Sequence, residues 1–174
     1  MGVRQAKAMG NTVTVISSSP GKEAVSKELG ADVFVVSSNL ESMKAANMSC
    51  DIILNTVSVH HDLDQYLPLL VGVSAASHQT PQARHGTIVQ LGARASLDSH
   101  SPHQMFLMLR KLRITGSIIG GISETQECID FCHKHGIIPN IKVVTSDALL
   151  DIYKRLKDKN DSAVRYVLDI EASF

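Results

Sequence analysis

The segment from Ser17 to Lys22 has the composition of a phosphate-binding turn. Its sequence, Ser-Ser-Ser-Pro-Gly-Lys, places three hydroxyl groups beside one cation and contains no acidic residue. Serine hydroxyls donate hydrogen bonds to phosphate oxygens, and a lysine ammonium supplies a point charge at short range. A structural alternative stays open, in which Ser19 caps a helix, Pro20 occupies its first position and Lys22 is solvated.

The elements around this segment alternate between short apolar runs and helical patterns. Gly30 is expected at the C′ position of one helix and Ser123 as the N-cap of another, with Gln126 at the third helical position. Strands that are apolar on both faces and separated by helices predict a doubly wound, Rossmann-like α/β fold with a parallel sheet and helices on both faces. The predicted strands are Thr12–Ile16, Val33–Val36, Asp51–Asn55, Thr87–Leu91, Arg113–Ile118, Ile141–Val144 and Val164–Ile170, and the predicted helices are 20–29, 40–46, 62–70, 102–111, 124–135 and one through Tyr153.

In a dinucleotide-binding fold, the end of the Thr12–Ile16 strand faces the adenosine ribose. Enzymes that use NAD place an acid there to bind the 2′-hydroxyl, whereas a 2′-phosphate requires neutral donors or a cation. The acid-free residues 17–22 therefore favour NADP if this segment binds a dinucleotide.

Composition excludes several other classes of function. Lys plus Arg and Asp plus Glu both total 17, and aromatic residues make up 4% of the chain, so neither a basic surface nor a stacking platform for nucleic acid is expected. No apolar run has the length of a membrane span, and residues 1–10 lack the apolar core of a signal peptide. Three scattered cysteines predict reduced thiols in the cytoplasm. The small and polar residues 71–85 predict an exposed insertion.

A metal site is not predicted from the histidines and cysteines. His60 and His61 are adjacent, and one predicted helix carries Cys128, Cys132, His133 and His135. The two cysteines are spaced i, i+4, but buried thiols that act as small apolar groups are more common than a two-ligand metal site on an exposed helix.

Several motifs in order resemble the cofactor domain of the zinc-type, medium-chain alcohol dehydrogenases, and most closely the cinnamyl alcohol dehydrogenase group with its bacterial aldehyde-reductase relatives. The resemblance covers nearly the whole chain except 71–84. The motifs are AKAMG (6–10), TVTVISSS (12–19), ELGAD (28–32), DIILNTV (51–57), GTIVQLGA (86–93), ITGSIIGGISETQE (114–127), DFC (130–132) and VRYVLDI (164–170).

The resemblance implies a set of cofactor-binding residues. Residues of the family that hold the 2′-phosphate of NADP match Ser17, Ser18, Ser19 and Lys22. The fourth-strand threonine of the family, which lies near the cofactor, matches Thr56. The glycine after the family's fifth strand, which permits close approach of the dinucleotide, matches Gly92. The segment that meets the nicotinamide carboxamide matches Ser117, Ile118 and Ile119, although Ile118 and Ile119 also fit a simple sheet core.

The resemblance also implies parts that this chain does not contain. Residues 1–174 match an incomplete NADP-binding domain, and the family's catalytic domain, which carries the zinc ligands, precedes the matched region. The family's first strand and its glycine-rich turn also precede the matched region in sequence. In the family's sheet this strand lies between the strands that match Thr12–Ile16 and Asp51–Leu54, so its absence leaves backbone groups of both neighbours without partners. Direct pairing of these two neighbours could recover some of those hydrogen bonds.

The implied function is NADP-dependent oxidation or reduction of primary alcohols and aldehydes, with no catalytic residue in this chain and no activity for the chain alone. Two alternatives remain. One is a non-catalytic module that binds cofactor or forms a homodimer through residues 113–121, since the family pairs this strand across a dimer. The other is a non-functional gene fragment.

Overall fold

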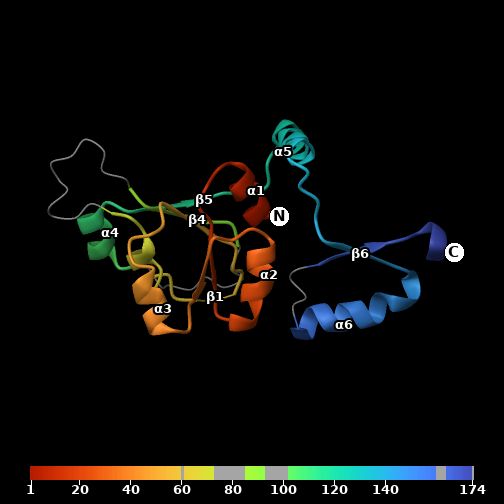
Figure 1. Ribbon diagram of the computed structural model, residues 1–174, viewed down its shortest axis with the longest axis horizontal. Helices are drawn as coiled ribbons and strands as arrows, with labels where there is room; N and C mark the ends of the chain where they lie inside the picture. Colours follow the sequence, from red (N-terminus) through yellow and green to blue (C-terminus); the bar gives the residue numbers. More distant parts are fainter. Residues whose placement is uncertain (60, 73–84, 93–101, 160–163, 174) are drawn as a thin grey trace. The chain divides into compact units, whose positions relative to one another are not determined.

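The computed structural model divides the chain into two compact units (Figure 1). One unit contains Met1–Val13, Glu23–Asp32 and Ile122–Phe174, and the other contains Thr14–Lys22 and Val33–Gly121. The structure describes residues 1–59, 61–72, 85–92, 102–159 and 164–173.

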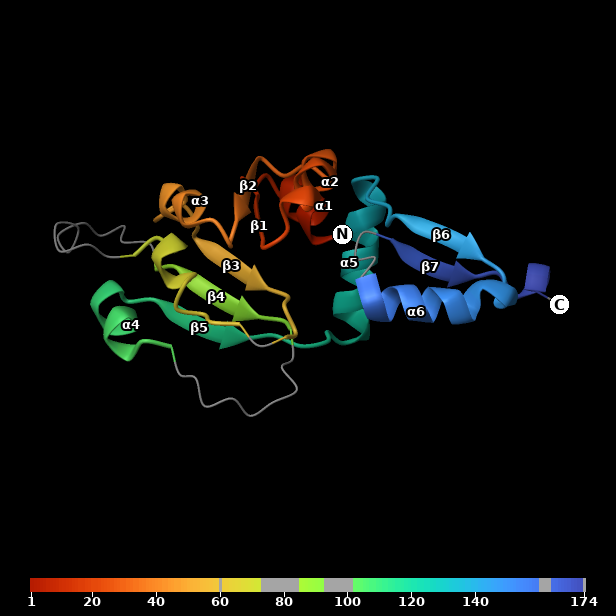
Figure 2. The same ribbon diagram turned by 90° about the horizontal axis from the view of Figure 1, so that it is seen from below.

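All strand pairings among the described residues are parallel, as expected for a doubly wound α/β fold. Figure 2 shows β3, β4 and β5 side by side and running in the same direction. The three sheets are β1 (Thr14–Ser17) with β2 (Val33–Val36), β3 (Ile52–Asn55) with β4 (Thr87–Gln90) and β5 (Arg113–Gly116), and β6 (Ile141–Val144) with β7 (Arg165–Leu168).

Helices connect the strands, and local side chains fix several of their ends. Asn39 caps α3, because its side-chain oxygen accepts hydrogen bonds from the amides of Glu41 and Ser42. Gly30 follows α2 with a φ of +101°, as predicted for a C′ glycine. The helices are α1 (Gly2–Ala8), α2 (Glu23–Glu28), α3 (Leu40–Ala45), α4 (Gln104–Arg110), α5 (Ile122–Lys134) and α6 (Leu149–Lys159), with short 3-10 turns η1 (Pro20–Lys22), η2 (Leu67–Leu69), η3 (Ser146–Ala148) and η4 (Glu171–Ser173).

β1 and β3 lie in separate sheets, although the sequence suggested that they could pair directly. Within the described residues β1 pairs with β2 alone, and β3 pairs with β4 alone. Each of these two strands therefore has one edge without a strand partner in the part of the chain that the structure describes. Apolar packing joins the two sheets instead.

The apolar core of the second unit is centred on β3. Ile53 of β3 and Cys50 just before it pack against both apolar clusters of this unit, whereas Ile52 and Leu54 are 62% and 55% exposed. This alternation is that of a strand with one covered face. One cluster contains Val35, Met43, Ala46 and Leu69, and the other contains Leu67, Leu70 and Ile88.

The predicted helix at 62–70 is wrong, because only Leu67–Leu69 forms a short 3-10 turn. Leu67, Leu69 and Leu70 are all at most 1% exposed, a spacing that no single face of an α-helix can bury. Pro68 removes an amide donor within the turn. Leu70 then becomes extended and forms a parallel bridge with Cys50.

Two further predictions have different outcomes. Ser123 is not the N-cap of its helix, because α5 begins at Ile122 and Ser123 lies inside its first turn. The insertion predicted at 71–85 falls largely outside the described residues, since 73–84 are not among them.

No helix in the described ranges is both long enough and apolar enough to cross a bilayer.

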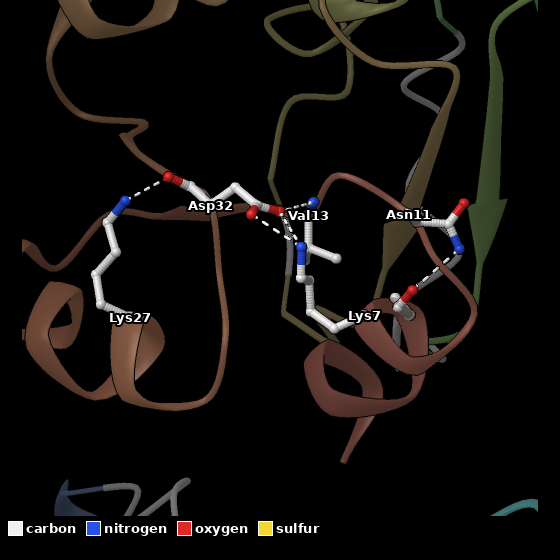
Figure 3. Close-up of polar contacts among 6 residues, drawn as sticks. Lys7, Asn11, Val13, Lys27 and Asp32 are labelled. Atoms are coloured by element: carbon white, nitrogen blue, oxygen red, sulfur yellow. Dashed lines mark hydrogen bonds and ion pairs between the residues drawn. The ribbon is translucent and has the colours of Figure 1, made fainter. Parts of the chain in front are cut away.

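The carboxylate of Asp32 ties three segments of the first unit together (Figure 3). Both of its oxygens lie 2.9 Å from Nζ of Lys7 in α1, and Oδ2 accepts a 2.7 Å hydrogen bond from the amide of Val13. Lys27 of α2 donates to the carbonyl oxygen of Asp32. The Lys7 hydrogen bond, followed by the Val13 amide, lowers the pKa of the Asp32 carboxyl below its ordinary value.

We predict that Asp32→Asn makes the chain less stable at neutral pH and removes part of its acid sensitivity. Because the folded-state pKa is lowered, the stabilisation by Asp32 is fully present above the unfolded-state pKa and is lost as pH falls through the folded-state value. The melting temperatures of wild type and variant should therefore begin to converge as pH falls below about 4, and should meet only below the lowered folded-state pKa. Glu41→Gln, which removes the exposed pair with Lys44 at 3.6 Å, is the matched control. Parallel melting curves for wild type and Asp32→Asn down to acid pH would contradict this role.

Candidate functional site

The predicted phosphate-binding segment lies directly at the carboxyl end of β1. The register pairs Ser17 with Val36 of β2, and the Ser17 carbonyl oxygen accepts a 2.9 Å hydrogen bond from the amide of Ser37. The amide of Ser19 donates to the Ser17 hydroxyl oxygen at 3.2 Å, and the amide of Lys22 donates to the Ser19 carbonyl at 3.2 Å. The chain therefore forms a compact turn as it leaves the strand.

This turn presents hydroxyl groups and a cation at the surface. Ser18, Ser19 and Lys22 are exposed, and Ser17 is half-buried. A second polar strand end adjoins the turn, because the hydroxyl of Ser38 donates to the Ser18 carbonyl at 3.3 Å. Pro20 is also the first residue of the short helix η1, as the structural alternative for this segment predicted. The start of this helix and the hydroxyl and ammonium donors therefore lie in the same six residues, 17–22.

The other predicted residues follow β3, β4 and β5 at one edge of their sheet. The register aligns Asn55, Gln90 and Gly116, so Thr56, Gly92 and Ser117 all come just beyond the carboxyl ends of neighbouring parallel strands. Backbone hydrogen bonds join these ends, because the Gly92 amide donates to the Asn55 carbonyl and the Ser117 amide to the Gln90 carbonyl, both at 3.0 Å. In open α/β sheets this edge is where ligands bind.

Gly92 is required by the chain's own backbone. A Cβ atom at this position would lie 2.5 Å from the carbonyl oxygen of Val57 and 2.9 Å from the carbonyl carbon of Thr56. The sequence predicted instead that a side chain here would block a dinucleotide. The observed crowding shows that the turn after β3 and the turn after β4 already touch without any ligand.

Ile118 and Ile119 are not sheet core. β5 ends at Gly116, and both isoleucines are 90% exposed. Of the two interpretations that the sequence left open for them, burial in the sheet is wrong for the described structure. Their position beyond the carboxyl end of β5 leaves the cofactor-facing role as a prediction.

A polar network at the same edge was missed by sequence reasoning. Asn55, the last residue of β3, is 8% exposed. Its Nδ2 lies 2.6 Å from Oε1 of Gln90 and 2.9 Å from Nε2 of His61, and its Oδ1 accepts from the Val57 amide at 3.2 Å. An asparagine closing an apolar strand was the available signal, because a buried amide needs partners.

The cysteines differ from the buried thiols that the sequence suggested. Cys128 is exposed and Cys132 half-buried, and the Gln5 amide nitrogen lies 3.2 Å and 3.3 Å from their sulfurs. All three cysteines are free thiols, with Cys50 half-buried. Among the residues that the structure describes, no group of three or more His, Cys, Asp or Glu side chains is placed to hold a metal ion.

The parallel strands, with hydroxyl-rich and glycine-containing turns at their carboxyl ends, define a Rossmann-like α/β fold, an architecture that many nucleotide-binding proteins share. The family model described as "Zinc-binding dehydrogenase" matches residues 1–134. The chain belongs to this family of alcohol oxidoreductases, as the resemblance in its motifs predicted.

Curated relatives include enzymes that act on alcohols and aldehydes. The chain is 38% identical over 169 residues to aldehyde reductase YahK of Escherichia coli (strain K12). This match covers 97% of this chain and 44% of that enzyme. It is 39% identical over 175 residues to cinnamyl alcohol dehydrogenase 2 of Oryza sativa subsp. japonica, with 99% and 44% covered. The chain thus spans less than half the length of these relatives.

Solved structures agree with this assignment. A cinnamyl alcohol dehydrogenase from Sorghum bicolor superposes with a TM-score of 0.84 at 35% identity, covering all of this chain and 45% of the other. The cinnamyl alcohol dehydrogenase of Helicobacter pylori, solved in complex with NADP(H), gives a TM-score of 0.77 at 29% identity, with 100% and 45% covered.

We predict that Gly92→Ala destabilises the chain by about 1–3 kcal/mol, because the new methyl group meets backbone atoms that cannot rotate away. Chemical denaturation with a constant m-value measures the change. Gly116→Ala is the matched control, since the structure describes no heavy atom within 4 Å of a Cβ there. Equal stability of the two variants would show that the turns after β3 and β4 separate easily.

Proposed function

We propose that this chain supplies the cofactor-binding part of an NADP-dependent oxidoreductase of primary alcohols and aldehydes. The observation that carries the proposal is the acid-free turn of Ser17–Lys22 at the carboxyl end of β1. The relatives named as aldehyde reductase and cinnamyl alcohol dehydrogenase support the substrate class, and the Helicobacter pylori structure with NADP(H) supports the cofactor.

The donor set fits a phosphate group on adenosine. Ser18 and Ser19 are exposed hydroxyl donors, and Lys22 carries the positive charge on the same turn. A carboxylate, which would bind the 2′-hydroxyl of NAD and repel a 2′-phosphate, is absent from residues 17–22. In this proposal the turn binds the 2′-phosphate, and the edge formed by Thr56, Gly92 and Ser117–Ile119 receives the rest of the dinucleotide.

When bound, NADP supplies hydride transfer, and this chain's residues bind and orient the cofactor. We assign no catalytic side chain to it. The zinc that the family name implies would be bound by residues outside this chain, so the chain alone binds cofactor without oxidising alcohols.

We predict that the chain binds NADP at least about tenfold more tightly than NAD, a difference of about 1.4 kcal/mol. Ser18→Asp should reverse this preference by placing a carboxylate where the 2′-phosphate lies, and Lys22→Met should weaken NADP binding alone. Titration calorimetry at low and high salt measures both effects, with the NADP preference shrinking at high salt. Lys142→Met, which removes an exposed charge on β6, is the control. Equal affinity for both cofactors, or no binding of either, would remove the proposal.

A second function, self-association through β5, has its own supporting observation. Among the described strands, β5 lies at the edge of its sheet, and the segment after it exposes Ile118 and Ile119 at 90% and Ile122 at 92%. An edge strand followed by exposed apolar residues favours pairing with a second copy.

We therefore predict a dimer of two copies that Ile119→Lys dissociates, since the substitution places a charge in the exposed apolar segment that follows the edge strand. Light scattering over a concentration series measures the mass. Ile138→Lys, the same substitution at a 67% exposed isoleucine in the other unit, is the control. A wild-type chain that stays monomeric at high concentration would exclude this function.

A further inference from the structure

His61 contacts the end of β3 from a residue that neither the family motifs nor the proposed cofactor set includes. It is half-buried, and its Nε2 lies 2.9 Å from Nδ2 of Asn55. Its Nδ1 lies 2.8 Å from the carbonyl oxygen of Val59. The ring also meets Tyr66 edge-on, with centroids 6.0 Å apart and planes at 78°. Tyr66 itself packs against the apolar cluster around Val35. Three contacts therefore fix the position of this imidazole.

The backbone decides which way the Asn55 amide points. The amide of Val57 can only donate, so the Asn55 atom 3.2 Å away must be the oxygen Oδ1. The NH2 group then points toward Gln90 and His61, with one hydrogen for each. A flipped amide would set two donors against each other at Val57.

The orientation of Asn55 in turn decides the tautomer of His61. Because Asn55 Nδ2 donates, Nε2 of His61 must carry a lone pair, and the ring proton sits on Nδ1. That proton is donated to the Val59 carbonyl. Both hydrogens of the Asn55 NH2 group and the Nδ1 proton of His61 thus have acceptors when His61 is neutral and protonated on Nδ1.

The network sets the spacing of the turns that the proposed function assigns to the dinucleotide. Asn55 fixes the Val57 amide, and the Val57 carbonyl lies against Gly92. Gln90 ends β4, just before the same glycine. We propose that His61 is a positioning residue for the dinucleotide site, acting through Asn55 on the Thr56–Val57 turn. This inference rests on the proposed function for its effect on cofactor, but the positioning itself is a property of the chain without ligand.

The test compares His61→Ala, His61→Gln and Val59→Ala in the full chain. Alanine removes the acceptor for Asn55, whereas the amide oxygen of glutamine can replace Nε2 as an acceptor. Val59→Ala shortens a 68% exposed side chain in the same loop and keeps the carbonyl that His61 contacts, so it is the matched control. Amide hydrogen exchange at Val57 measures the turn, and titration with NADP measures the site.

We expect His61→Ala to speed exchange at Val57 by roughly tenfold, the factor for one hydrogen bond, and to weaken NADP binding by a similar factor. His61→Gln should return both to within about twofold of wild type. A nitrogen-15 spectrum of the wild-type imidazole should show the proton on Nδ1. A proton on Nε2, unchanged Val57 exchange in His61→Ala, or glutamine no better than alanine would overturn the inference. A wild-type chain with the expected exchange and tautomer that binds no NADP would refute the proposed function and leave the positioning role intact.

Discussion

The buried amide of Asn55 is the constraint on which the edge of the larger sheet depends. A primary amide removed from water must satisfy its donors and acceptor within the protein, and an unpaired group costs about 1–3 kcal/mol. Asn55 meets this demand with Gln90 of the next strand, His61 of the following loop and the Val57 amide. Each partner is thereby fixed relative to the carboxyl end of β3. The contact between Gly92 and Val57 then follows, because both flanking turns are drawn to the same point.

The positions of the strands along the chain and the fold class could be predicted from the sequence because they depend on local pattern. Val33–Val36 and Ile141–Val144 are strands with the predicted bounds, and runs of β-branched residues between helical segments leave few other arrangements. The helix predicted at 62–70 failed because its leucines satisfy a tertiary demand, namely burial of Leu67, Leu69 and Leu70 together. The separation of β1 from β3 likewise depends on pairing between distant residues, which a local pattern does not contain.

The candidate site divides in the same way. Ser17–Lys22 could be proposed as a phosphate-binding turn from residue types and the family resemblance, because phosphate binding needs donors and charge within one short turn, and this role stays a prediction. The exposure of Ile118 and Ile119 could not be predicted, since two isoleucines at the end of a strand fit a buried sheet core as well as an exposed segment. The Asn55, Gln90 and His61 contacts join residues from three segments. Only the parallel register that sets Asn55 against Gln90 brings them together.

Two kinds of force position the two halves of the candidate site. Within each sheet, backbone hydrogen bonds fix the register of the strand ends, and these bonds are directional. Between the β1–β2 sheet and the β3–β4–β5 sheet, the shared contacts are apolar, with Val35 of β2 in the same cluster that Ile16 and Ile53 adjoin. Apolar contact is non-directional, so it holds the two sheets together but fixes their separation less closely than backbone hydrogen bonds between paired strands would. A ligand that binds both the Ser17–Lys22 turn and the Thr56–Gly92 edge would fix the separation of the two sheets. By linkage, its binding free energy would stabilise that arrangement.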